Sequence, residues 1–282
     1  MASIITGGIK LFELSANLSV NGATISASTG ASGASGCLDR NPDTYWRSVA
    51  STDLITETLT IGLAASTVIN RILLLDINWK AFVIKYNVSG VWTHFASVYG
   101  MDGLKSNITE TVFADSSAYY EFASVTTDQI QITITTTQVT NAQKYAAQII
   151  CTSELGTLAG YPDIKKIEIS KNSRSQKTLS GKFVIQKSIE TAAFTLDFKN
   201  YPRASTYNID IALMLSLHDR ENPFIVWLCG GRRGTSYFGY TLRGFRLQDA
   251  YVMQVSKALD LSYTKNIYKG QLNAKVELQE HI

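Results

Sequence analysis

The chain has 282 residues, of which 45% are hydrophobic and 17% are charged. This composition is typical of a folded globular protein and excludes a disordered chain, and no stretch approaches the ~18 apolar residues of a membrane span. Residues 1–155 hold 8 Lys and Arg against 12 Asp and Glu, whereas residues 156–282 hold 18 against 11. This asymmetry predicts two domains with different neighbours; the alternative is that lysines keep a β-rich surface soluble and protect its edges.

The cysteines and the N-terminus indicate where the chain folds. Cys37, Cys151 and Cys229 are far apart and form no CxxC pair, which argues against a disulfide framework or a zinc site and predicts buried free thiols. The first residues lack the charged region and apolar core of a secretory signal. We therefore expect folding in a reducing cytoplasm.

The residue pattern of the first half of the chain predicts short strands. An apolar run at 9–14 predicts a short strand or docking arm, and the small residues at 26–36 predict a surface loop. Strands without a convincing helix, repeating roughly every 8–12 residues, favour a sandwich or barrel. The predicted strands are 57–62, 68–75, 82–86, 92–98, 111–113, 119–122 and 130–136.

Glycine, proline and aspartate cluster at 156–163 and predict a boundary between domains 1–157 and 158–282. In the second half, residues 210–218 are the one plausible helix, and their apolar density predicts burial on most faces. The other elements are strands, so an α+β unit is expected. These strands are predicted at 164–169, 183–185, 193–198, 224–228, 237–247, 251–261 and 273–278.

A dense turn lies between Cys37 and Ser48. It packs Asp, Asn, Pro, Asp and Thr into residues 39–44, and Trp46 follows at once. Proline fixes φ, and Asp and Asn side chains bond their own backbone, while the tryptophan would anchor the loop to a core. A loop this rich in oxygen donors either caps a β-structure or holds a hard cation.

This turn resembles the opening signature of the discoidin-like (coagulation-factor type C, galactose-binding-like) jelly-roll family, in which a small residue, Asp, a turn and Thr-x-Trp-x-Ser begin the domain. Residues 69–75 resemble the family's central core strand and 82–93 its hairpin with Trp-Thr, while 129–134 and 153–155 resemble its closing strands and terminal Glu. The resemblance covers residues 15–157. It implies a mainly β fold class: an N-terminal jelly-roll β-sandwich followed by a β-rich (α+β), barrel-like domain with one helix.

In this family the Asp loop often holds a structural calcium ion against the C-terminal strand. The resemblance implies a Ca²⁺ site here, and oxygen donors of these types are what Ca²⁺ takes, about six to eight at a time. The alternative is a loop satisfied by its own Asx-turn hydrogen bonds, without a metal. The implied ligands are Gly36, Asp39, Asn41, Thr44 and Glu154.

Family members that bind sugars or lipids use loops at one end of the sandwich. The candidate loop joins an aromatic ring, an amide and a cation, which suits stacking and hydrogen bonding to a sugar. The alternative is that Trp79 packs under the sheet and its polar neighbours are solvated. The expected ligand-binding residues are Asp76, Asn78, Trp79 and Lys80, with Arg47, His94 and Tyr99 converging on them.

Catalytic motifs are missing from the sequence. There is no GxSxG, HExxH or P-loop pattern, and His94, His218 and His281 have no spaced nucleophile or ligand partner. The glycines and arginines at 230–234 predict a hairpin tip, because no helix follows them. No aromatic-and-basic stripe indicates nucleic-acid binding. We expect a protein that is not an enzyme, binds no nucleic acid and does not insert into a membrane.

The second half is similar in style, without a defined motif, to distal tail and baseplate proteins of bacteriophages, notably at 222–228 and 244–251. This similarity implies a structural component of a phage tail tip or baseplate, located in the virion and assembled in the host cytoplasm. Its jelly roll would project outward as a module that docks carbohydrate or protein. Its partners would be other tail proteins, copies of itself in a ring and a cell-surface glycan. The alternative is a soluble carbohydrate-binding, lectin-like or adhesion protein. A glycosidase accessory fragment is disfavoured, because no paired carboxylates stand out.

Overall fold

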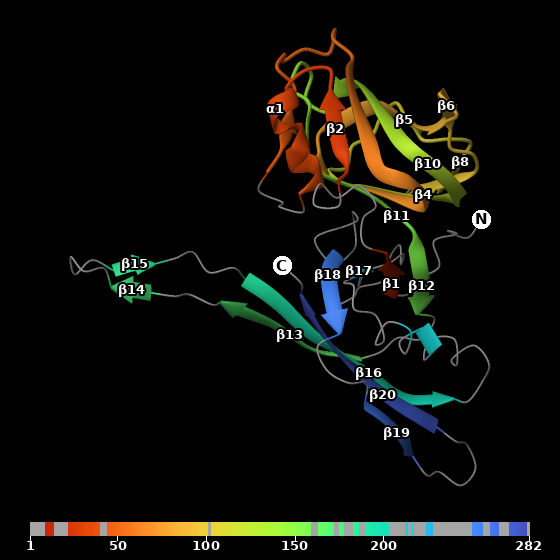
Figure 1. Cartoon of the computed structure of the whole chain (residues 1–282), viewed down its shortest axis with the longest axis vertical. Coiled ribbons are helices and arrows are strands. Elements are labelled where there is room, and N and C mark those ends of the chain that lie inside the picture. Colours follow the sequence, from red (N-terminus) through yellow and green to blue (C-terminus); the bar gives the residue numbers. More distant parts are fainter. Residues whose placement is uncertain are drawn as a thin grey trace. The chain divides into compact units, whose positions relative to one another are not determined.

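The computed structural model divides the chain into two compact units (Figure 1). Of the described residues, 22–155 form the first unit, and 9–13, 156–158 and those from 163 onward form the second. No helix in this part of the chain is long and apolar enough to cross a membrane. The structure describes residues 9–13, 22–39, 44–100, 103–158, 163–171, 175–177, 183–185, 190–202, 212–213, 216, 224–227, 250–255, 260–264 and 271–280.

The first unit is built on a ten-stranded sheet in which the pairs are antiparallel. Its central order is β3-β11-β4-β10-β5-β6, with β2 beside β4, β9 beside β5, β7 beside β10, and β8 beside β7. The strands are β2 (Thr24–Ala27), β3 (Trp46–Arg47), β4 (Glu57–Ile77), β5 (Trp79–Val88), β6 (Val91–His94), β7 (Val98–Gly100), β8 (Gly103–Lys105), β9 (Thr109–Glu110), β10 (Ala118–Thr137) and β11 (Tyr145–Thr152).

Two long strands, β4 and β10, run through the whole sheet. The first part of β4 pairs with the last part of β10, where β2 and β5 join them; the second part of β4 pairs with the start of β10, where β11 and β7 join them. Register shifts between Glu121 and Val125 and between Thr127 and Gln129 lie between the two parts. Irregularities of this kind bend a strand pair, which allows one sheet to fold over on itself.

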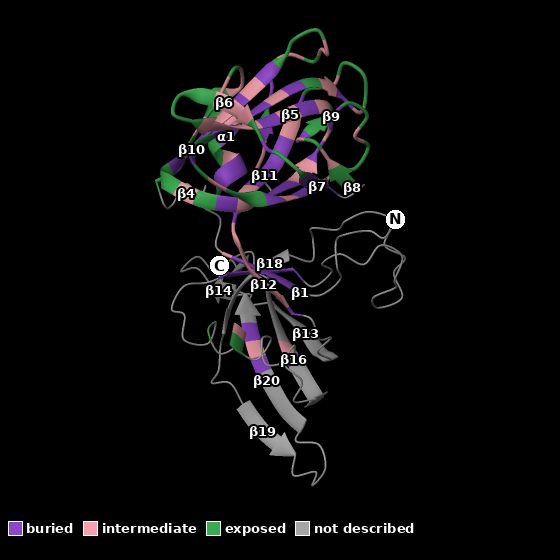
Figure 2. Cartoon of the chain, turned by 90° about the vertical axis from the view of Figure 1, so that its right-hand side faces the viewer, coloured by how far each residue is buried: buried purple, intermediate pink, exposed green. Residues whose placement is uncertain are grey.

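Buried residues alternate with more exposed ones along these strands (Figure 2), and the buried ones form one core. Ile130, Ile132 and Ile134 of β10 are buried, as the period of two along a strand requires. The two parts of the sheet meet through aromatic rings: Phe82 of β5 lies 6.5 Å between centroids from Tyr120 of β10. The first unit is therefore a β-sandwich, and the prediction of a mainly β chain is confirmed.

The second unit holds an eight-stranded sheet and a two-stranded ladder, β14-β15. The large sheet runs β12-β1-β17-β18-β20-β16-β13, with β19 also beside β20. Its strands are β1 (Ile9–Phe12), β12 (Glu154–Leu158), β13 (Asp163–Lys171), β16 (Glu190–Pro202), β17 (Phe224–Trp227), β18 (Ala250–Val255), β19 (Asp260–Thr264) and β20 (Gln271–Glu280), and the ladder joins β14 (Ser175–Lys177) to β15 (Phe183–Ile185).

Strand β1 belongs to the sheet of the second unit, although it comes from the start of the chain. It pairs antiparallel with β17, with Leu11 opposite Val226 and Phe12 opposite Ile225. Leu11 and Phe12 are fully buried, and the rings of Phe12 and Trp227 lie 6.3 Å apart. The apolar run at 9–12 is thus a strand whose partner lies far along the sequence.

Several elements differ from their predictions. The runs 57–62 and 68–75 are one strand, because the largely exposed residues between them stay extended. Residues 26–36 are not an open loop: β2 ends at Ala27, and a short helix α1 (Ala31–Ala34) and a 3₁₀ helix η2 (Ser35–Leu38) follow. Residues 111–113 lie after the end of β9 and form no strand.

Two further predictions lie mostly or wholly outside the described residues. Of the predicted helix 210–218, only Ala212, Leu213 and Ser216 are described, and all three are helical. The predicted strand 237–247 lies wholly outside the described residues.

Candidate functional site

Asn78 holds three backbone groups at one end of the sandwich. Asn78 is the only residue between β4 and β5. Its Nδ2 donates to the carbonyl of Gln143 at 2.7 Å, its Oδ1 accepts from the backbone N–H of Tyr145 at 2.9 Å, and its carbonyl accepts from the N–H of Gln138 at 2.8 Å. Asn78 was predicted to contact a ligand; both ends of its amide instead hold the start of β11 in place.

Four side chains at the same end of the sandwich as Asn78 form what we call the tyrosine cluster: Tyr45, Arg47, Asp76 and Tyr145. The rings of Tyr45 and Tyr145 meet edge to face, with centroids 6.0 Å apart and planes at 84°. The guanidinium of Arg47 lies 5.5 Å from the centroid of the Tyr45 ring. Arg47 is opposite Tyr145 in the register of β3 and β11, so the cluster is set by strand pairing.

The charges of the cluster act on Tyr145. Partial burial raises the pKa of its phenol, the negative charge of Asp76 raises it further, and the positive charge of Arg47 lowers it. The net shift is upward, so the phenol is protonated at neutral pH and can donate a hydrogen bond. Arg47 is exposed and the other three side chains are half-buried, which leaves them fixed but accessible.

Asp76 has an unusual backbone. Its φ is 47° inside strand β4, a left-handed conformation that Asp tolerates better than most residues other than glycine. The next residue, Ile77, donates its N–H to the carbonyl of Ser116 at 2.7 Å. Such conformations occur often at functional sites. Here the change of backbone direction accompanies a half-buried carboxylate whose charge acts on Tyr145.

Trp79, which was predicted to stack on a ligand, is part of the core. Its side chain is fully buried, and its ring meets Phe82 edge to face at 5.6 Å. The expectation is corrected because Trp79, as the first residue of β5, points inward. Lys80 is exposed beside it, and only its backbone carbonyl has a described contact, with the N–H of Phe113.

His94 and Tyr99 do not converge on this end. His94 is opposite Lys85 of β5, six residues from Trp79, which is about 20 Å along a strand. Tyr99 is opposite Glu121 of β10, near the far end of the strand from Thr137, the partner of Trp79. Of the predicted ligand-binding residues, Arg47 and Asp76 therefore lie in the tyrosine cluster. The other two members of the cluster, Tyr45 and Tyr145, were not predicted.

The predicted calcium loop is partly assembled. The hydroxyl of Thr44 lies 2.9 Å from both carboxylate oxygens of Asp39 and 3.3 Å from the carbonyl of Gly36. Gln148 of β11 was not predicted here: its Nε2 donates to the Gly36 carbonyl at 2.8 Å and to Asp39 Oδ1 at 3.1 Å. Asn41 lies outside the described residues.

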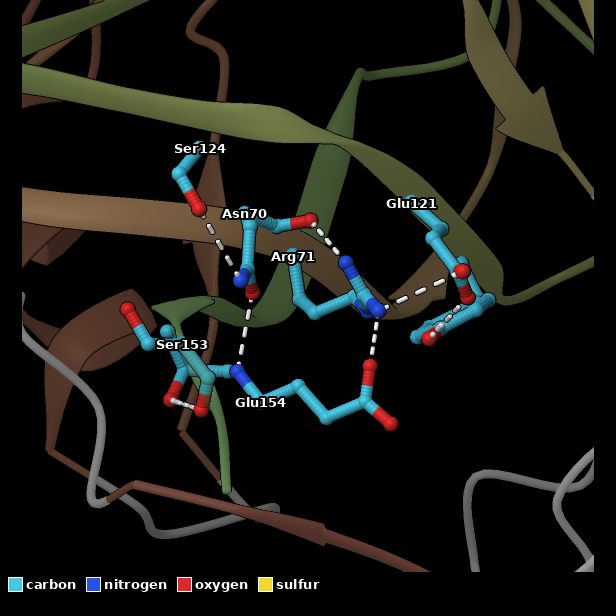
Figure 3. Close-up of polar contacts among 8 residues, drawn as sticks. Asn70, Arg71, Glu121, Ser124, Ser153 and Glu154 are labelled. Carbon is cyan, nitrogen blue, oxygen red and sulfur yellow. Dashed lines mark hydrogen bonds and ion pairs between the residues drawn. The ribbon is translucent and has the colours of Figure 1, made fainter. Parts of the chain in front are cut away.

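Glu154 is not in this loop but in what we call the Arg71 network, made of Asn70, Arg71, Glu121 and Glu154 (Figure 3). Its carboxylate forms an ion pair with the buried Arg71, whose Nη2 is also 3.3 Å from Glu121 Oε1. The backbone N–H of Glu154 donates to Asn70 Oδ1 at 2.8 Å. Six residues of extended chain, about 20 Å, separate Glu154 from Gln148.

No group of three or more His, Cys, Asp or Glu that could hold a metal occurs among the described residues. Cys37 and Cys151 are free and buried, as expected; Cys229 lies outside the described residues. Burial raises the pKa of the Cys37 thiol to about 12. A hydrogen bond with the Trp46 backbone lowers this pKa and the negative charge of Asp39 raises it, and both effects are smaller than that of burial. The thiol donates to the carbonyl of Ala146 at 3.4 Å.

A surface hollow of about 600 Å³ lies elsewhere on the first unit, along residues 105–112. Its carboxylate is already used, since Glu110 accepts from Lys105 at 2.5 Å and from the Tyr120 hydroxyl at 2.9 Å. None of its lining residues is aromatic. The tyrosine cluster is therefore the better candidate for binding a ligand that needs a ring to stack on.

The chain is similar to solved structures of other proteins. No family model matches the chain, and no curated protein matches it. Similar structures include a mutant of chitosan-binding module 1 from a chitosanase/glucanase of Paenibacillus sp. IK-5 (TM-score 0.40, 18% identity, 50% of this chain and 99% of that one). The family 32 carbohydrate-binding module of C. perfringens NanJ in complex with galactose has a TM-score of 0.38 and 18% identity, over 49% of this chain and 98% of that one.

A pectin-binding module is also similar, with a TM-score of 0.34 and 18% identity over 45% of this chain and 88% of that one. These neighbours are carbohydrate-binding modules, each covered almost completely by about half of this chain.

Proposed function

We propose that the first unit binds carbohydrate through the tyrosine cluster. The observation that carries this proposal is the pair of half-buried tyrosine rings, edge to face, with a cation and a carboxylate beside them. Aromatic rings give a sugar apolar surface against which its C–H groups pack. Arg47 supplies hydrogen-bond donors and Asp76 supplies acceptors, and sugar hydroxyls need both.

The residues of the tyrosine cluster are held in place before a ligand binds, which supports the proposal. Asn78 holds the backbone of Tyr145, and strand pairing holds Arg47 opposite it. A site whose side chains are already in place loses less entropy when the ligand binds. Binding of this kind needs no catalytic group, in keeping with the expectation of a protein that is not an enzyme.

Carbohydrate binding by the first unit was expected under both functions, and by itself it corresponds to the alternative of a carbohydrate-binding, lectin-like or adhesion protein. The phage tail-tip role, with its ring and its tail-protein partners, stays a prediction, because the described residues of the second unit offer no observation specific to it. A cell-surface glycan would be a partner under either role.

The proposal is tested by applying the labelled full-length chain to a glycan array. We expect retention by a defined group of glycans. Tyr145→Ala and Arg47→Ala should each weaken binding of those glycans at least tenfold, which is about 1.4 kcal/mol. Lys80→Ala and His94→Ala serve as controls, because these residues are exposed on the same unit outside the cluster, and should bind as wild type. Absence of retention, or equal losses in all four variants, would contradict the proposal.

A further inference from the structure

What we call the Asp39 loop comprises residues 36–39 and Thr44, and its oxygen atoms face a hydrogen-bond donor. The two hydrogens of the Gln148 amide match two acceptors, the Gly36 carbonyl at 2.8 Å and Asp39 Oδ1 at 3.1 Å. The opposite orientation of the amide would place its oxygen against a carbonyl and a carboxylate, with no hydrogen between them. The hydrogen-bond network therefore fixes which end of the amide faces the loop.

This donor set does not fit the calcium ion that the family resemblance implies. Calcium takes about six to eight oxygens, and here the NH₂ group, which carries partial positive charge, faces the Gly36 and Asp39 oxygens that would have to bind the ion. Thr44 also directs its hydroxyl at Asp39. The second implied carboxylate, that of Glu154, is paired with Arg71 instead.

The loop and strand β11 are close-packed around the same contacts. A Cβ added to Gly36 would lie 3.2 Å from Thr44 Cβ, so the two sides of the loop already touch. The Cys37 thiol donates to the carbonyl of Ala146, two residues before Gln148. The loop is thus joined to β11 at two neighbouring points, both by hydrogen bonds to protein groups.

We propose that the side-chain amide of Gln148 takes the place of the calcium ion, so that the Asp39 loop is closed onto β11 without a metal. A calcium ion would link the opening loop to the closing strand by binding oxygens of both. Gln148 makes the same link by donating to the oxygens of the loop. Because Tyr45 follows Thr44 directly, this link also positions one ring of the tyrosine cluster.

Thermal unfolding of the full-length chain tests this, in EDTA and in millimolar calcium. We expect the wild-type Tm to be the same in both. Gln148→Met, which keeps the size of the side chain and removes both hydrogen bonds, should lower the Tm equally in both conditions. Gln129→Met is the matched control, since Gln129 is an exposed glutamine on β10, and it should leave the Tm unchanged.

Gln148→Glu is the complementary variant. It removes the donor and adds a carboxylate beside Asp39, so we expect a lower Tm than wild type in EDTA and a partial recovery in calcium. A wild-type Tm that rises with calcium would overturn the proposal, as would Gln148→Met unfolding at the wild-type temperature. If Gln148→Glu fails to fold, the wild-type and Gln148→Met comparison decides alone.

Discussion

Trp79 and Tyr145 lie at the same end of the sandwich, but they have different surroundings. Trp79 is enclosed by the core, and its Nε1 is buried without a hydrogen-bond partner in the described structure. Tyr145 is half-buried, with its backbone held by Asn78. An aromatic ring can take part in binding only if one of its faces or edges is open, so residue type alone does not tell which ring at this end a ligand could reach.

Replacing Trp79 separates its core role from a ligand role. Trp79→Ala should destabilise the first unit by about 3–5 kcal/mol, because it leaves a large cavity. Trp79→Phe should cost much less, since it keeps a ring and removes the unsatisfied N–H. Urea denaturation midpoints measure both, with Lys80→Ala expected within ~0.5 kcal/mol of wild type as a surface control. A small effect of Trp79→Ala would contradict its place in the core.

Asp53 gives a pH-dependent prediction at the same scale. Its carboxylate accepts from the N–H groups of Thr137 at 3.0 Å and Asn141 at 3.1 Å. Desolvation raises the pKa of Asp53, but these hydrogen bonds and the charge of Lys144 outweigh it, and the pKa lies below 3.8. A depressed folded-state pKa adds stability above the unfolded-state value, and this stability is lost as the pH falls through the folded-state value.

Asp53→Asn should therefore be less stable than wild type at neutral pH, and the difference should shrink below about pH 4. Urea midpoints of the two proteins between about pH 3 and 7 measure this. A difference that stays constant over the whole range would show that ionisation of Asp53 does not contribute.

At the scale of elements, alternation of apolar residues predicted where strands lie but not where they join. β4 continues through exposed residues that carry no core-facing signal, so its two parts were read as separate strands. The helix α1 was missed because its Ala, Ser and Gly residues give no apolar period. Ala34 is nevertheless buried, and Gly30 begins the helix with φ of 64°.

Gly30 and Gly90 form a matched pair for testing this packing. Both have positive φ, so alanine at either position is strained by about 1 kcal/mol. A Cβ on Gly30 would lie 2.0 Å from the carbonyl oxygen of Arg47, whereas a Cβ on Gly90 would meet nothing within 4 Å. Gly30→Ala should thus cost at least ~2 kcal/mol more than Gly90→Ala in urea denaturation. Equal losses would mean that α1 does not pack closely on β3.

At the scale of the whole molecule, pairings distant in sequence were the part that could not be predicted. The family resemblance implied roles for Arg47 and Asp76, which lie in the tyrosine cluster. Tyr45 and Tyr145 were missed because their contact depends on the register of β3 and β11. For the same reason no residue pattern indicated that Gln148 would meet the Asp39 loop or that β1 would pair with β17.

The Arg71 network fixes the point where the chain leaves the first unit. Arg71→Met would remove the cation that pairs with the carboxylates of Glu121 and Glu154. Breaking a buried ion pair in this way costs about 3–5 kcal/mol. We expect a lower Tm and faster backbone hydrogen exchange at residues 153–155. Arg71→Met combined with Glu154→Gln should recover part of the loss. Unchanged exchange at these residues would show that the network does not hold the exit strand.

The central claim is that the tyrosine cluster is a carbohydrate site, and calorimetric titration of one retained glycan tests it most directly. The wild type, Tyr145→Ala and Lys80→Ala would be compared in the same EDTA-containing buffer. Saturable binding by wild type and Lys80→Ala, with at least a tenfold higher Kd for a folded Tyr145→Ala, is the predicted result. Equal Kd values for all three proteins would place the glycan elsewhere on the chain and contradict the account.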